Sequence, residues 1–167
     1  MRFDFIIKFD KNLRFRCLRC GRCCSGYGGK LQLELYSSDI EAINNLELEI
    51  HDFFIEKEGL YYMNLKSDGS CPFYDAATRR CLLKTRYDFF PWNCLVYPLQ
   101  AVEGRSFFII RVNPAAEENC PGMGRGKPLR RTLLPELIRG IVGIVLNKDP
   151  WSVSQNLALS VSNIWWL

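Results

Sequence analysis

Four cysteines with the spacing C-x-x-C-x-x-C-C lie within eight residues, at positions 17 to 24. The thiolate form of cysteine is a metal ligand, and a two-residue gap lets neighbouring sulfurs turn toward one point. The spacing therefore predicts a site for a metal ion or an iron–sulfur cluster, and the chain has enough cysteines for two four-thiolate sets. The eight candidate ligands are Cys17, Cys20, Cys23, Cys24, Cys71, Cys81, Cys94 and Cys120.

The adjacent cysteines, Cys23 and Cys24, need a separate explanation. Neighbouring side chains tend to point apart, so we expect these two sulfurs to serve two centres, or two metals of one assembly. The first three cysteines then need one remote thiol. Cys71 and Cys120 are both followed by proline, as is the remote fourth ligand of the bacterial ferredoxin run. Either of the two is a candidate for the first set.

The kind of metal follows from the ligand types. Zinc sites favour C-x-x-C pairs, often with histidine, whereas a triple run is typical of bacterial ferredoxins. The single histidine, His51, lies in a predicted helix, where we expect an ordinary, partly exposed side chain. An all-sulfur set suits both metals, and the spacing favours one or two 4Fe–4S clusters over zinc. Disulfides and unligated thiols are further alternatives.

Composition indicates a folded protein of modest size. The chain has 167 residues, is 48% hydrophobic and carries a net charge of +4, so one domain is expected and nucleic acid is not an expected partner. No signal peptide is evident, and the apolar run at 141–146 is too short to cross a bilayer. We therefore expect a soluble cytoplasmic protein that does not bind membranes, in which metal chemistry is more common than disulfide formation.

The periodicity of apolar residues predicts an α+β fold, with short strands and helices around a cysteine-rich loop centre. Residues 1–128 are expected to form the metal-binding domain, and 129–167 a helical extension packed on the same domain. Strands are predicted at 2–9, 13–16, 31–35, 60–65 and 106–112. Helices are predicted at 39–58 in two pieces that end at Gly59, at 129–146, and from Pro150 to the terminal tryptophans, with loops and short helical turns over 71–98.

Three cysteine-containing elements occur together in this chain. They are FRCLRCGRCC at 15–24, GSCPFYD at 69–75 with Cys81 shortly after it, and FPWNCLVYPL at 90–99. Together they resemble the YkgJ-type CxxCxxCC family of zinc- or iron-chelating proteins over about residues 13–122. The resemblance implies metal chelation by the cysteines. One branch with a similar cluster, the flagellin lysine N-methylases, implies an iron–sulfur cluster and S-adenosylmethionine.

The chain departs from that family pattern at two positions, and it lacks one further signature. Phe90 and Leu95 stand where the family usually has arginine. The C-x-x-x-C-x-x-C spacing of radical S-adenosylmethionine enzymes is absent. Apart from these differences, the resemblance implies an iron–sulfur protein that acts in electron transfer or in redox-dependent protein modification such as lysine methylation. The alternative is a zinc-stabilised binding module without catalytic activity, so the pattern leaves open whether the chain is an enzyme.

Two further features could contact a protein partner or substrate. The basic run at 125–131 contains Arg125, Lys127, Arg130 and Arg131, and is typical of a solvated helix start. Trp165 and Trp166 near the end of the chain are expected to pack on the core, with a partner surface as the alternative. The segment GMGRGK at 122–127 does not match a phosphate-binding loop and is expected to be an ordinary loop.

Overall fold

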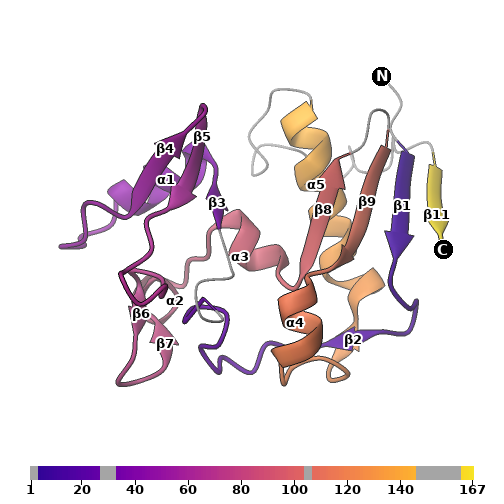
Figure 1. Ribbon diagram of the computed structural model, residues 1–167, viewed down its shortest axis with the longest axis horizontal. Helices are drawn as coiled ribbons and strands as arrows, with labels where there is room; N and C mark the ends of the chain where they lie inside the picture. The colour runs from indigo at the N-terminus through magenta and orange to yellow at the C-terminus, as the bar shows by residue number, and fades with distance from the viewer. Residues whose placement is uncertain (1–3, 27–32, 104–106, 146–162) are drawn as a thin grey trace. The chain divides into compact units, whose positions relative to one another are not determined.

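The computed structural model describes residues 4–26, 33–103, 107–145 and 163–167 (Figure 1). The chain divides into two compact units. Unit 1 combines Met1–Arg16 with Val96–Leu167, and unit 2 is Cys17–Leu95. Both units contain helices and strands, so the predicted α+β class is confirmed.

Unit 1 is built on a four-stranded sheet with the strand order β11-β1-β9-β8. Strand β1 is parallel to both of its neighbours, and β8 is antiparallel to β9. The elements of this unit are β1 (Asp4–Lys8), β2 (Arg14–Phe15), β8 (Leu99–Glu103), β9 (Phe107–Val112), α4 (Pro114–Asn119), β10 (Lys127–Pro128), the 3-10 helix η1 (Leu129–Arg131), α5 (Leu133–Val145) and β11 (Asn163–Trp166).

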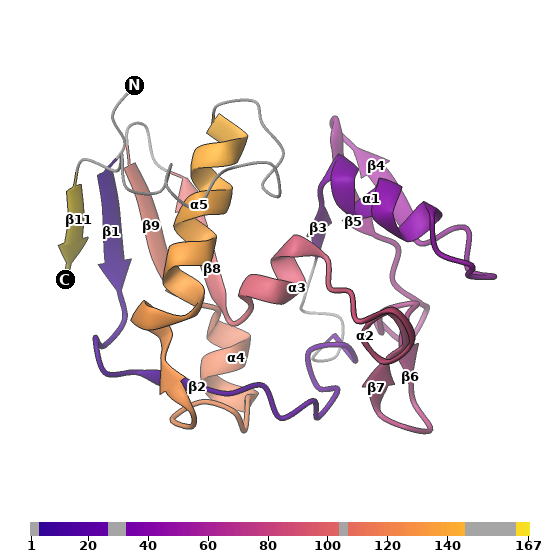
Figure 2. The ribbon, with the colours of Figure 1, turned by 180° about the vertical axis from the view of Figure 1, so that it is seen from behind.

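The core of unit 1 lies between this sheet and helix α5. Every second side chain of β1 and β9 is buried, with Phe5 stacked on Phe108 across the two strands, as expected for strands with one buried face. Helix α5 contributes Leu137, Ile138 and Ile141 to the buried set. Figure 2 shows α5 lying across one face of β8 and β9.

Unit 2 contains two small antiparallel sheets, one of order β3-β5-β4 and one formed by the hairpin β6-β7. Its elements are β3 (Glu34–Leu35), α1 (Ser37–Asn44), β4 (Phe54–Lys57), β5 (Leu60–Met63), β6 (Tyr74–Asp75), β7 (Arg80–Cys81), α2 (Leu82–Tyr87) and α3 (Trp92–Val96), which reaches the boundary between the units. Its buried core consists of Leu35, Ile43, Phe53, Met63, Phe73 and Leu83.

The predicted helix over 39–58 is only partly present. Helix α1 ends at Asn44, and the second predicted piece is wrong, because β4 pairs with β5 through a hairpin at Glu58 and Gly59. Both turn residues have positive φ, 54° and 79°, which two-residue hairpin turns of the I′ type require. Cross-strand pairing therefore outweighs the local helical pattern there. His51 lies outside any helix and is exposed.

The predicted strands at 2–9, 13–16, 60–65 and 106–112 are present as β1, β2, β5 and β9. The strand expected at 31–35 is described only at its end, as β3, since its first residues lie outside the described ranges. The long helix is present as η1 followed by α5.

The predicted terminal helix lies largely outside the described residues. Its last part is wrong, because Asn163–Trp166 forms strand β11 and pairs with β1. The division at residue 128 differs from the boundaries of the two units and stays a prediction. In the described ranges, no helix has both the length and the apolar character needed to cross a membrane.

Candidate metal centre

The cysteine loop of unit 2 is held by its own backbone rather than by regular secondary structure. The backbone N–H of Ser25 donates to the Gly21 carbonyl at 2.8 Å, and that of Gly26 donates to the Cys23 carbonyl at 3.0 Å. A Cβ at Gly21 would lie 2.7 Å from the Tyr74 ring, and φ there is +74°. Only glycine fits this position, so the loop is seated closely against the β6-β7 hairpin.

Two more cysteines are brought to this loop by that hairpin. The Cys71 N–H donates to the Cys24 carbonyl at 2.8 Å, which ties the two cysteine segments together. Tyr74 pairs with Cys81 across the hairpin. Phe73, which is fully buried, lies between Cys71 and the hairpin in sequence and anchors this segment in the core.

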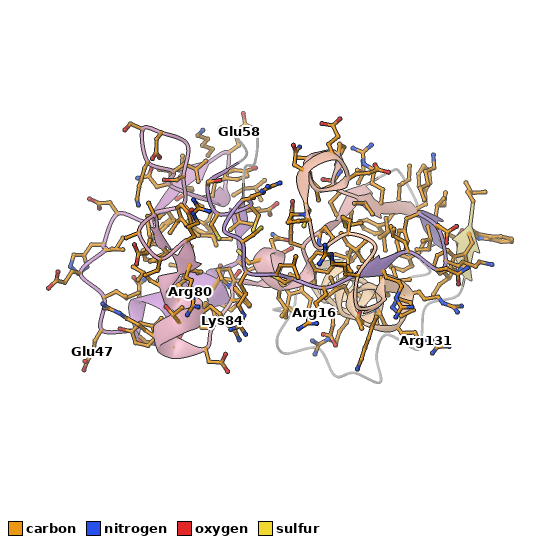
Figure 3. All side chains as sticks on the ribbon, turned by 90° about the horizontal axis from the view of Figure 1, so that it is seen from below. Arg16, Glu47, Glu58, Arg80, Lys84 and Arg131 are labelled. Atoms are coloured by element: carbon orange, nitrogen blue, oxygen red, sulfur yellow. The ribbon has the colours of Figure 1, made fainter. Side chains whose placement is uncertain are left out.

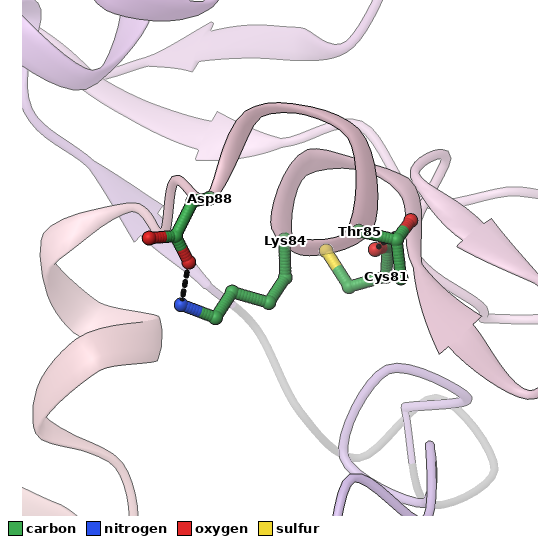
Figure 4. A network of polar contacts seen from close by, with 4 residues as sticks. All are labelled: Cys81, Lys84, Thr85 and Asp88. Carbon is green, nitrogen blue, oxygen red and sulfur yellow. Dashed lines mark hydrogen bonds and ion pairs between the residues drawn. The ribbon is translucent and has the colours of Figure 1, made fainter.

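Cys81 is the residue immediately before α2, where backbone N–H groups are free to face a side chain. Burial raises the pKa of its thiol, and the N–H groups of Lys84 and Leu83 partly offset that rise. Figure 4 shows Cys81 at the start of the helix, together with the Thr85 hydroxyl, which donates to the Cys81 carbonyl at 3.0 Å. Lys84 forms an ion pair with Asp88 one turn later.

Cys94 lies in the short helix α3, which is held by a buried carboxylate. Asp39, with 0% of its surface exposed, accepts a hydrogen bond from the Trp92 N–H at 3.0 Å and another from the Tyr36 N–H at 3.1 Å. The Asn93 amide adds a bond to the Glu34 carbonyl at 2.9 Å. The start of α3 is therefore fixed on the β3-α1 segment, two residues before Cys94.

Five thiols of unit 2 act electrostatically on one another. They are Cys23, Cys24, Cys71, Cys81 and Cys94, from three separate segments of the chain. Burial raises the pKa of Cys71 to about 12, with a smaller contribution from Cys81. Burial also raises the pKa of Cys94, and the charges of Cys71, Cys81 and Cys23 add to that rise. These half-buried thiols thus lie near enough to influence one another's pKa, and a cation would relieve the cost of their negative charge.

Cys23 and Cys24 interact directly with each other, and their assignment to two centres stays a prediction. The Cys24 thiol donates a hydrogen bond to the Cys23 sulfur, which lowers the pKa of Cys23 to about 7. The same bond raises the pKa of Cys24.

The other three cysteines have different surroundings. Cys17 is exposed, Cys20 is half-buried on the same loop, and the Arg19 N–H donates to the Cys17 sulfur at 3.4 Å. Cys120 belongs to unit 1, where it ends helix α4. Their predicted role as ligands stays a prediction.

The donor atoms fit a thiophilic metal, although the side chains are arranged as free thiols. In the described ranges, no three Cys, His, Asp or Glu side chains already adopt the geometry of a metal site. Metal binding would therefore require the cysteine sulfurs to move closer together. All-sulfur donors of this kind suit zinc and iron–sulfur clusters alike.

Comparison with known families agrees with this donor set. Residues 16–121 match the model of the family CxxCxxCC, described as "Putative zinc- or iron-chelating domain". The chain belongs to the CxxCxxCC family. The matched region begins one residue before Cys17 and ends one residue after Cys120, so all eight cysteines of this CxxCxxCC protein lie within it. The predicted family membership is confirmed, and with it the assignment to a metal-chelating family.

The chain is also similar to a protein of Methanocaldococcus jannaschii that is named "Uncharacterized protein MJ0939". The two are 26% identical over 132 residues, which covers 76% of this chain and 43% of the relative. The chain thus spans less than half the length of that relative. No solved structure matches the chain.

Sequence reasoning missed Asp39 as part of this site. Asp39 is the first residue of the helix predicted over 39–58, and it lies in the first turn of α1. No local pattern indicates that its second oxygen reaches the backbone of Trp92, because the two residues are far apart in the sequence.

Proposed function

We propose that this CxxCxxCC protein binds an iron–sulfur cluster of the 4Fe–4S type through the thiols of unit 2 and acts in electron transfer. The observation that carries the proposal is the convergence of five thiols from three segments. Four of them are sufficient for one cluster. When bound, the cluster would supply a site for one-electron oxidation and reduction.

The chain's own residues would supply the ligands and exclude water. Cys71 and Cys81 come from the hairpin region and Cys94 from α3, so three ligands lie on elements held by core contacts or buried hydrogen bonds. Cys23 and Cys24 come from the loop, whose backbone is joined to Cys71. Protein-held ligands of this kind limit the rearrangement that accompanies a change of charge, which favours electron transfer.

Zinc is the second candidate, and the small size of the core of unit 2 favours it. That core rests on a handful of buried side chains and would gain stability from a four-thiolate zinc site. A protein of this kind would be a binding module without a reaction of its own. Lysine methylation with S-adenosylmethionine has less support, because the radical-enzyme spacing of cysteines is absent.

The test is purification without oxygen, followed by measurement of iron, zinc and acid-labile sulfide and by a visible spectrum. An iron–sulfur protein should be brown and contain iron and sulfide in equal amounts. A colourless protein that contains zinc after the same treatment would overturn the iron–sulfur proposal in favour of the zinc module. A protein without either metal would overturn both.

A pair of variants links the metal to the thiols of unit 2. Cys94→Ser removes one proposed ligand, and we expect it to lower the metal content and to bleach the visible spectrum. Ser25→Ala is the matched control, because it removes a hydroxyl that bonds to the Arg22 carbonyl on the cysteine loop but leaves all the sulfurs. Equal metal content in the two variants would show that Cys94 is not a ligand.

A further inference from the structure

A cluster of positive charge in unit 1 lies outside the cysteine site and is assembled from two distant segments. Strand β2 pairs with β10, and the Arg14 side chain donates to the Gly126 carbonyl at 2.5 Å across 112 residues of sequence. Together with η1 they form a surface that we call the basic patch. Its members are Arg14, Arg16, Arg125, Lys127, Arg130 and Arg131.

Close backbone packing brings these segments together. A Cβ at Gly126 would lie 2.6 Å from the Cβ of Arg16, and one at Gly122 would lie 2.3 Å from the Arg16 carbonyl oxygen. Both distances are shorter than any real contact of a Cβ atom, so glycine is required at these positions. The Leu129 N–H donates to the Leu13 carbonyl at 2.9 Å and fixes the start of η1 beside β2. The basic patch is therefore built by the fold.

The charge of the basic patch is not neutralised from within the chain. All six cations are exposed, and in the described part of the chain none of them forms an ion pair. No acidic residue occurs at 11–16 or at 119–135. Arg130 and Arg131 also precede helix α5, where the helix dipole disfavours positive charge. Figure 3 labels Arg16 and Arg131 among the side chains of unit 1.

We propose that the basic patch binds the phosphate backbone of nucleic acid without reading its sequence. Five of its six cations are arginines, whose planar fork matches phosphate oxygens. Protein interfaces instead centre on buried apolar or aromatic anchors. No large exposed hydrophobic side chain of the described residues belongs to the basic patch. The patch therefore lacks the apolar anchor of a protein interface, and a phosphate backbone held by charge fits it better.

The overall composition does not suggest nucleic-acid binding by this chain. The net charge of +4 does not indicate nucleic-acid binding, because the 18 acidic residues balance most of the 22 basic ones. Those acidic residues lie elsewhere in the chain, whereas the fold collects six cations in one place. The local charge, rather than the net charge, determines the attraction of a polyanion.

The test uses the full chain, purified without oxygen, and fluorescein-labelled 20-nucleotide RNA and DNA strands of mixed sequence. Fluorescence anisotropy should give dissociation constants of about 1 to 100 μM near physiological salt. About four neutralised phosphates on a single strand predict a slope of about −3 for log affinity against log salt. A poly-glutamate peptide of the same length and phosphatidylserine vesicles are measured in parallel.

Two triple variants with the same change in net charge make the test specific. The first replaces three arginines of the basic patch that form no bond with another side chain among the described residues: Arg125→Gln, Arg130→Gln and Arg131→Gln. The control replaces three exposed cations of unit 2: Lys57→Gln, Arg79→Gln and Arg86→Gln. Circular dichroism and thermal unfolding verify that both variants fold.

The proposal predicts that the patch variant loses at least about tenfold in affinity and reduces the salt slope by about 2, whereas the control stays within about twofold. Equal losses in both variants would overturn it, since they would reflect net charge alone. No binding to either nucleic acid would overturn it as well. Tighter binding to poly-glutamate or to the vesicles would assign the basic patch to an acidic protein or to a membrane instead.

Discussion

Replacing Asp39 by asparagine tests whether this buried carboxylate holds the segment that carries Cys94. Its two oxygens accept hydrogen bonds from the backbone N–H groups of Trp92 and Tyr36. Asparagine keeps the shape and one oxygen, but its NH₂ group must then face a backbone N–H. One bond to a carboxylate is lost and one buried donor is left without an acceptor, which costs about 3 kcal/mol. For a chain of this length that loss lowers the unfolding temperature by about 6 to 12 °C.

The assay compares thermal and urea unfolding of Asp39→Asn with those of the parent, in the metal-free protein, so that metal content does not contribute. Asp52→Asn is the matched control, because Asp52 is exposed and the substitution changes the charge in the same way. We expect no measurable change in the control. A second readout is the rate at which iodoacetamide modifies Cys94, followed by mass spectrometry. Release of α3 should raise that rate in Asp39→Asn alone.

Two results would refute this reasoning. An unfolding temperature for Asp39→Asn within about 2 °C of the control would show that the buried bonds contribute little to the free energy of unfolding. Unchanged modification of Cys94, with lower stability, would show that Asp39 stabilises unit 2 without positioning the cysteine.

Two further predictions concern the loop on β2 and the protonation of the site. Gly126→Ala should destabilise the protein by about 1 to 3 kcal/mol more than Gly124→Ala in urea unfolding. Both glycines have positive φ, but of the two only a Cβ at Gly126 would lie within 4 Å of other atoms, those of Arg16 and Phe15. Equal losses of stability in the two variants would contradict the close packing. Because burial raises the pKa of Cys71 to about 12, this thiol is protonated at neutral pH and must release its proton on becoming a ligand. Metal affinity should therefore rise between about pH 6 and about pH 8, with protons released in titration calorimetry, and an affinity independent of pH would contradict this.

The elements that the sequence predicts correctly are those in which local pattern and long-range packing agree. Strands β1 and β9 alternate apolar and polar residues, and the sheet buries the apolar side of each. Helix α5 has one apolar face and lies on the sheet with it. The residues of strand β4 also fit a helical spacing, so the sequence predicts a helix there. Its pairing with β5 depends on a turn with two positive φ values, and one of the two residues is Glu58 rather than glycine.

For the candidate site, residue type identifies the donors and the fold determines which of them meet. The thiolate of cysteine is a metal ligand, so the eight cysteines stand out as candidates from the sequence alone. Which five gather depends on a glycine that allows the loop to approach Tyr74, and on a carboxylate that reaches Trp92 from another segment. Neither contact leaves a local pattern, since each joins residues more than fifty positions apart. The same holds for the basic patch, where the close approach of Gly126 and Arg16 concentrates a charge that the whole composition conceals. In this chain, therefore, the chemistry of single residues is readable from the sequence, whereas the grouping of those residues into sites comes from long-range backbone contacts.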